Sequence, residues 1–99
     1  MRFSICIPTL NEEKYIGGIL GCLEKQTFRD FEVIVSDGNS SDNTKKEVMK
    51  FSGKFPLTFL ESPKRGVSFQ RNYAAKSAKG EYIVFFDADV MIEKDFLDK

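Results

Sequence analysis

Short apolar runs alternate along the chain with stretches in which apolar residues recur at helical spacing. The runs have the length of buried strands and cover Phe3–Ile7, Phe31–Val35, Leu57–Leu60 and Tyr82–Phe86. Pro8 closes the first run. The last run is apolar at every position, which predicts a strand that is buried on both faces.

The first helical stretch follows the first strand. Asn11 is placed to cap it, and Glu12 and Glu13 come next, where carboxylates favour a helix N-terminus. Its expected apolar face consists of Tyr15, Ile16, Ile19, Leu20 and Leu23. Its three glycines each cost up to ~1 kcal/mol relative to alanine, and close packing on the sheet is one hypothesis for their presence. They are Gly17, Gly18 and Gly21.

Two more helices are predicted. Ser41 or Asp42 is placed to cap a short one between the second and third strands. The other runs from about Ser68 to Ala78. Its expected inward residues are Phe69, Tyr73 and Ala74.

Strand–helix–strand repeated three times predicts parallel strands with right-handed crossovers. The fold class is therefore α/β, a three-layer, Rossmann-like and mainly parallel sheet in one domain over residues 1–99. The pattern breaks off after Leu97, where a further helix is only starting, and so apolar a fourth strand makes a poor sheet edge. We expect an architecture that is incomplete at its C-terminal side, with self-association through the fourth strand if another copy covers that edge.

Composition excludes several function classes. Fifteen Lys and Arg balance fifteen Asp and Glu, so no overall field recruits nucleic acid or an anionic membrane. The absence of histidine and of a Cys-x-x-Cys motif excludes a zinc site or a histidine-based triad. Cys6 and Cys22 lie in apolar contexts and are expected as core thiols rather than a disulfide. Without a signal-like or membrane-spanning segment, the chain is expected to be cytoplasmic, although a longer parent chain could be membrane-associated.

Polar residues gather where the predicted strands end. These segments are Pro8–Glu12, Asp37-Gly38, Lys64–Gly66 and Asp87–Asp89. Ligands of open parallel sheets bind beyond the carboxyl ends of the strands. If the first strand lies between the second and the fourth, Asp37 and Asp87 are two strand spacings apart, roughly 10 Å, which suits a nucleoside with its diphosphate.

Asp87-Ala88-Asp89 carries the most specific chemistry. Two carboxylates after an apolar strand repel each other unless they share a cation or one of them is protonated. Mg²⁺ or Mn²⁺ prefers oxygen ligands and would leave positions for phosphate oxygens. A solvated acidic turn is the plainer interpretation.

The other candidates also have plain alternatives. Asp37-Gly38 is a common turn sequence. Arg71 is either a surface arginine or a contact to a phosphate or base. Glu12 is either a charge at the start of a helix or a ligand contact.

Taken together, the chain resembles the family-2 inverting glycosyltransferases of the GT-A fold. The matching segments are Ser4–Glu13, Gln26–Phe28, Phe31–Gly38, Ser41–Thr44, Gly66–Ser68, Arg71-Asn72, Ala78–Ile83 and Asp87–Asp89. The family often has a second Asp where Ser36 stands.

This resemblance implies a donor that is a UDP- or GDP-sugar and a Mn²⁺ or Mg²⁺ cofactor. Pro8 and Thr9 would line the base pocket through their backbone, with Glu12 nearby, and Asp37 would accept a hydrogen bond from the base. Arg71 would approach the nucleotide, Asp87 the ribose or the metal, and Asp89 would ligate the metal directly. The sugar would pass with inversion to a hydroxyl of an unknown acceptor, with a general base expected beyond Lys99 and an acceptor half that these residues lack.

Three other hypotheses remain. Phe85–Val90 also resembles the Asp-x-Asp motif of haloacid dehalogenase-type phosphatases, in which the first Asp is the nucleophile, but this motif usually follows the first strand. A nucleotidyltransferase lacks its expected glycine-rich phosphate loop here. A non-catalytic remnant that binds nucleotide is the third.

Overall fold

The computed structural model describes residues 1–98. In chain order the elements are β1 (Phe3–Thr9), α1 (Ile16–Glu24), β2 (Phe31–Asp37), α2 (Thr44–Met49), β3 (Leu57–Glu61), α3 (Val67–Ala75), β4 (Tyr82–Phe85) and the 3-10 turn η1 (Phe96–Asp98). All strand pairs are parallel and the sheet order is β3-β2-β1-β4. The first strand therefore lies between the second and the fourth, as the site hypothesis required.

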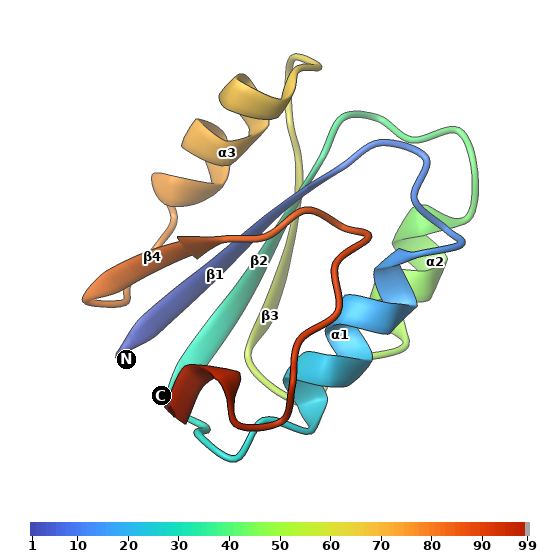
Figure 1. Cartoon of the computed structure of the whole chain (residues 1–99). Helices are drawn as coiled ribbons and strands as arrows, with labels where there is room; N and C mark the ends of the chain where they lie inside the picture. Colours follow the sequence, from blue (N-terminus) through green and yellow to red (C-terminus); the bar gives the residue numbers. More distant parts are fainter. Residues whose placement is uncertain (99) are drawn as a thin grey trace.

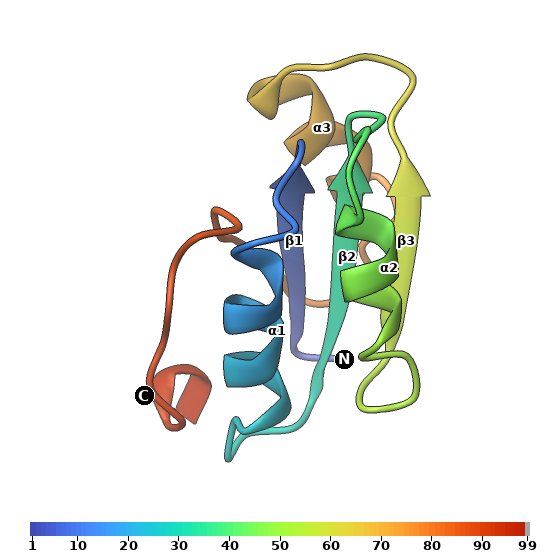
Figure 2. The same ribbon diagram turned by 90° about the vertical axis from the view of Figure 1, so that its right-hand side faces the viewer.

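The helices cover the sheet on both sides, which confirms the predicted three layers. α1 and α2 lie on one face and α3 on the other (Figures 1 and 2). Because both of its faces are covered, β2 is buried at every position, and β1 at every position after Phe3. The carboxyl ends of the strands all point to the same edge of the sheet.

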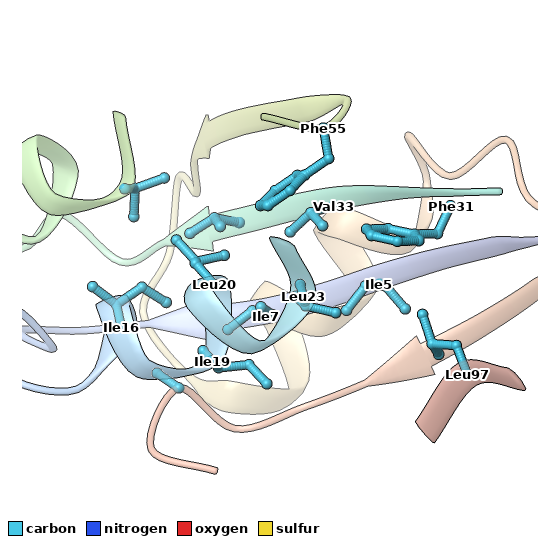
Figure 3. Packing of buried hydrophobic residues seen from close by; sticks show 13 residues of the cluster. Ile5, Ile7, Ile16, Ile19, Leu20, Leu23, Phe31, Val33, Phe55 and Leu97 are labelled. Atoms are coloured by element: carbon cyan, nitrogen blue, oxygen red, sulfur yellow. The ribbon is translucent and has the colours of Figure 1, made fainter. Parts of the chain in front are cut away.

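The main apolar core fills the layer between the sheet and α1. Alternate strand residues Ile5, Ile7, Val33 and Val35 meet the helix residues Ile16, Ile19, Leu20 and Leu23 (Figure 3). A second, smaller cluster of Cys6, Ile34 and Ala74 lies under α3. Successive side chains of a strand point to opposite faces of the sheet, so β1 and β2 contribute alternate residues to the two clusters.

The start of α1 differs from the prediction. The helix begins at Ile16 and has no side-chain cap. Asn11 adopts a left-handed conformation (φ 54°), and its Oδ1 accepts a hydrogen bond from the Ser41 amide at 2.8 Å. Tyr15 is exposed, whereas the other four predicted apolar residues are buried. Asn11 therefore joins two loops instead of capping a helix.

The glycines of α1 do not pack on the sheet. An added Cβ at Gly17 or Gly21 would meet nothing within 4 Å, whereas one at Gly18 would lie 2.8 Å from the Met91 sulfur. The sheet-packing hypothesis is wrong, and only Gly18 is matched to a neighbour, in the segment after β4.

Thr44, the first residue of α2, donates hydrogen bonds to Asp42, which precedes the N-cap residue Asn43. Asn43 is the N-cap and makes no side-chain capping bond. The Asp42 carboxylate instead accepts hydrogen bonds from the Thr44 amide at 3.0 Å and the Thr44 hydroxyl at 2.5 Å. Asp42 thus accepts hydrogen bonds at the start of α2 as expected of a capping residue, but the N-cap position itself is Asn43 and not Ser41 or Asp42.

Of the three residues of α3 predicted to face inward, only Ala74 does so; Tyr73 is partly exposed and belongs to neither core cluster. Gln70 and Ala74 face the sheet, while Phe69 is exposed and stacks on Tyr73 with ring centroids 6.2 Å apart. The Gln70 amide takes the inward position and donates hydrogen bonds to the ends of two strands.

β4 is an edge strand, and the prediction that it is buried on both faces is wrong. Within residues 1–98 it pairs with β1 alone, and Tyr82, Ile83 and Phe85 are exposed. The chain then returns along α1, where the Thr27 amide donates to the Lys94 carbonyl at 2.8 Å and Leu97 joins the core (Figure 3).

Two further expectations concern the whole chain. Cys6 and Cys22 are both free, as predicted, but only Cys6 is a core thiol, and the prediction that Cys22 is buried is wrong. No helix among the described residues has the length and apolar character needed to cross a membrane.

Candidate functional site

A cavity of about 330 Å³ opens at the carboxyl ends of β1 and β4, beside the start of α3. Its walls come from three segments distant in sequence: Pro8, Thr9, Leu10 and Glu12 after β1, Gly66, Val67 and Gln70 at α3, and Asp87, Ala88 and Asp89 after β4. Five of the predicted site residues therefore share one cavity. They are Pro8, Thr9, Glu12, Asp87 and Asp89.

Asp37 lies behind this cavity and does not line it. Asp37 as a whole residue is only 4% exposed. The Thr9 hydroxyl donates to Oδ1 at 2.6 Å, and Ser40 donates through its amide and its hydroxyl at 2.8 and 2.6 Å. Asp37 thus fixes the end of β1 and the loop before α2, and it reaches the cavity through Thr9.

Arg71 is also outside the cavity wall, but it is tied to it. Its guanidinium donates to Asp87 Oδ1 at 3.0 Å and lies over the Phe85 ring, 5.7 Å from its centroid. Its Nε is buried and has no hydrogen-bond partner among the described residues. Arg71 is therefore a partly exposed side chain that Asp87 and Phe85 anchor beside the site.

The acidic side of the cavity is electrostatically strained. Partial burial raises the pKa of Glu12, and the negative charges of Asp89, Asp42 and Asp87 raise that pKa further. The raised pKa of Glu12 thus reflects its burial first and the neighbouring carboxylates second.

These donors fit a divalent cation only if a ligand completes its coordination. Within residues 1–98 no group of three or more acidic, cysteine or histidine side chains is arranged to hold an ion. Mg²⁺-like ions are commonly held by one or two carboxylates together with substrate phosphates and water. Asp89 and Asp87 match that oxygen-only, two-carboxylate pattern.

Sequence reasoning missed Gln70, and it noted Gly66 only as part of the segment after the third strand and of a family motif. Gln70 is 3% exposed, lines the cavity and makes three hydrogen bonds there. Gly66 precedes α3 with a φ of 132°. The available signal was the four-residue spacing of Gln70, Ala74 and Ala78, which the neighbouring aromatic residues obscured.

Known proteins resemble this chain over nearly all its length. The profile of the family described as "Glycosyl transferase family 2" matches residues 4–99. The poly(ribitol-phosphate) beta-N-acetylglucosaminyltransferase TarS of Staphylococcus aureus is 43% identical over 101 residues, which cover 98% of this chain and 18% of TarS. The chain therefore spans less than a fifth of that relative.

Solved structures agree with this match. TarS residues 1–349 in complex with UDP superpose with a TM-score of 0.95 at 40% identity, over 99% of this chain and 30% of that one. The mannosyltransferase PcManGT of Pyrobaculum calidifontis, solved with GDP-Man and Mn²⁺, gives a TM-score of 0.85 at 33% identity, over 91% and 28%.

Proposed function

The chain belongs to glycosyl transferase family 2 and has its GT-A fold, and from this premise we propose that its cavity binds a nucleoside-diphosphate sugar with a divalent cation. The observation that carries the proposal is the cavity itself, in which the loop after β1 faces the Asp87–Asp89 loop after β4. A polar wall and an acidic wall on adjacent parallel strands suit a ligand with a base at one end and a diphosphate at the other.

The base would lie at the β1 side, against the backbone of Pro8 and Thr9 and near Glu12. The Thr9 carbonyl already accepts hydrogen bonds from Gly38 N and Gln70 Nε2, so other groups of this wall must meet the base. A carboxylate offers about four acceptor sites, and three hydrogen bonds reach Asp37. Because Asp37 lies behind the cavity wall, we propose that it supports base binding by holding Thr9 in place and not, as the family resemblance implied, by accepting the base N–H directly.

The diphosphate would lie at the β4 side. Asp89 makes no hydrogen bond or ion pair within residues 1–98 and would ligate Mn²⁺ or Mg²⁺ directly. Asp87 would contact the ribose or the same cation, and Arg71, already paired with Asp87, would approach the nucleotide. When bound, the cation would neutralise charge on the departing diphosphate.

For the whole protein we propose sugar transfer with inversion. An acceptor hydroxyl oxygen attacks the anomeric carbon, the bond from that carbon to the diphosphate oxygen breaks, and a carboxylate takes the hydroxyl proton. We assign no general base among residues 1–98 and propose donor binding as the contribution of these 99 residues, which span under a third of the matched structures. The family match accounts for Asp87 and Asp89 without the phosphatase hypothesis.

Titration calorimetry with UDP and GDP, with and without Mn²⁺ or Mg²⁺, tests the proposal. We expect cation-dependent binding by the parent chain, at least a roughly tenfold loss in Asp89→Ala, and a smaller loss in Asp37→Ala. Asp30→Ala is the matched control, because Asp30 is exposed at the opposite, amino end of β2.

Equal affinity of the Asp89→Ala and parent chains in Mn²⁺ would contradict the cation assignment. Nucleotide binding that does not depend on a cation would support the nucleotide site and contradict the proposed metal site. A parent chain that binds neither nucleotide would refute donor binding altogether.

A further inference from the structure

Gln70 lies where two segments of the cavity wall, the loop after β1 and the start of α3, meet the end of β2. It projects from α3 and is buried between the ends of β1 and β2. Its Nε2 donates to the Thr9 carbonyl at 2.9 Å and to the Ser36 carbonyl at 2.8 Å. Its Oε1 accepts from the Gly66 amide at 3.1 Å. One side chain thus joins β1, β2 and the turn that begins α3.

The hydrogen-bond pattern requires an amide of this length. Two carbonyl acceptors face the two N–H groups of Nε2, and one N–H donor faces Oε1. Glutamate would turn an ionised carboxylate toward two carbonyl oxygens. Methionine would fill the space but lose all three hydrogen bonds, and the Thr9 carbonyl would keep only the bond from the Gly38 amide. Asparagine is one methylene too short.

Gly38 gives independent support, because it makes room for this amide. A Cβ at Gly38 would lie 2.7 Å from Gln70 Oε1 and 3.2 Å from Gln70 Cδ. Among the described glycines, positive φ angles occur at Gly53 and Gly66 and not at Gly38. The Asp37-Gly38 pair therefore needs glycine for the close approach of Gln70, and not for its turn conformation.

The contacts of Gln70 lead directly to the residues proposed to hold the nucleotide. Thr9 carries the hydroxyl that bonds Asp37, and the Gly38 amide shares the Thr9 carbonyl with Gln70. Gly66 and Val67 form the cavity wall at the N-terminus of α3. Movement of Gln70 would displace both walls at once.

We propose that Gln70 is a positioning residue, which sets the spacing between the base-binding loop after β1 and the N-terminus of α3 and so determines nucleotide affinity. This role rests on the proposed function, since it assumes that the cavity binds a nucleoside diphosphate. Gln70 acts through Thr9, Gly38 and Gly66.

Gln26 provides a matched control. It is another buried glutamine, and its Nε2 donates to the Cys22 and Glu93 carbonyls while its Oε1 accepts from the Leu97 amide. It comes two residues after α1, whose last turn lies towards the amino ends of the strands, away from the cavity (Figure 2). Gln26→Met and Gln70→Met therefore lose the same number and kind of hydrogen bonds.

The experiment measures UDP and GDP affinity in Mn²⁺ by calorimetry, with thermal unfolding of each variant. We expect Gln70→Met to bind roughly tenfold more weakly, while Gln26→Met stays within about twofold of the parent despite a similar loss of stability. Gln70→Glu should bind weakly at pH 8 and recover part of its affinity, relative to the parent, at pH 5, because a protonated carboxyl donates one hydrogen bond. Gln70→Met should show no such recovery.

A nucleotide-independent readout separates this proposal from the proposed function. Gln70→Met should speed hydrogen exchange at the Gly66 amide, which Gln26→Met should leave unchanged. Nucleotide affinity in folded Gln70→Met equal to the parent's, or reduced only as much as in Gln26→Met, would overturn the positioning role. Failure of the parent chain to bind any nucleotide would overturn the proposed function, and unchanged Gly66 exchange would overturn the described coupling by itself.

Discussion

Cys6 shows what burial does to a single ionisable side chain in this protein. It lies under α3 with Ile34 and Ala74 and is fully buried. Burial, and then the charge of Glu32, raises the pKa of its thiol from 9.0 to about 11. The thiolate is the reactive form of cysteine, so the folded protein should keep Cys6 inert at neutral pH.

The raised pKa also predicts how stability depends on alkaline pH. Below pH 9 the thiol is protonated in both states, whereas between pH 9 and 11 only the unfolded chain loses the proton. Stability should therefore fall with rising pH in this window, by up to roughly 1.4 kcal/mol per pH unit from this group. Urea unfolding from pH 8 to 11 should show a shallower decline in Cys6→Ala; identical slopes in both chains would contradict the shift.

Single residues were predictable where their chemistry depends on position along a strand. Pro8, Thr9, Asp87 and Asp89 follow apolar runs, and the rule that parallel strands end at one edge places them together. Gln70 was not predictable, because its role comes from carbonyls that the fold brings beside it and not from its neighbours in sequence.

At the scale of elements, the three glycines of α1 lower its helix propensity, and contacts with neighbouring residues do not explain two of them. Gly17 and Gly21 have open space where a Cβ would be, while Gly18 faces the Met91 sulfur. Gly17→Ala and Gly21→Ala should each stabilise the protein by about 0.5–1 kcal/mol, because alanine loses less backbone entropy in a helix. Gly18→Ala should gain less, since Met91 must move.

Thermal or urea unfolding of the three glycine variants measures this order. The three positions lie in one helix of nine residues, so Gly18→Ala serves as the internal control for the other two. A loss of stability in Gly17→Ala or Gly21→Ala would mean that these glycines serve a contact outside residues 1–98.

Elements were predicted well wherever one face had to be buried. The four strands and three helices are all present, because apolar periodicity reflects burial. Their ends were less predictable: α1 starts at Ile16 and not at Asn11, since Asn11 and Ser41 satisfy each other across two loops. The hydrogen bond between the two loops thus replaced the helix cap that the local sequence favoured.

At the scale of the whole molecule, the sheet is asymmetric. β1 and β2 are covered on both faces, whereas β4 is an edge with three exposed apolar residues, Tyr82, Ile83 and Phe85. The apolar run Tyr82–Phe86 wrongly predicted a strand buried on both faces, but it correctly indicated that this strand would expose apolar side chains if it lay at the sheet edge. The sequence alone could not predict what pairs with the free edge of β4, because the burial of an edge strand depends on the segment or second copy that pairs with it.

We therefore predict that the 99-residue chain self-associates through β4. An edge strand presents unpaired backbone N–H and C=O groups, and its apolar side chains add a hydrophobic driving force for pairing with a second copy. Sedimentation velocity should show dimers or larger species that grow with concentration, and Ile83→Lys should shift the chain towards monomer, since a charged edge opposes pairing. Thr58→Lys is the matched control, because Thr58 is exposed on β3 at the other edge of the sheet. A parent chain that stays monomeric at high concentration, or equal effects of the two lysines, would show that β4 is not the contact.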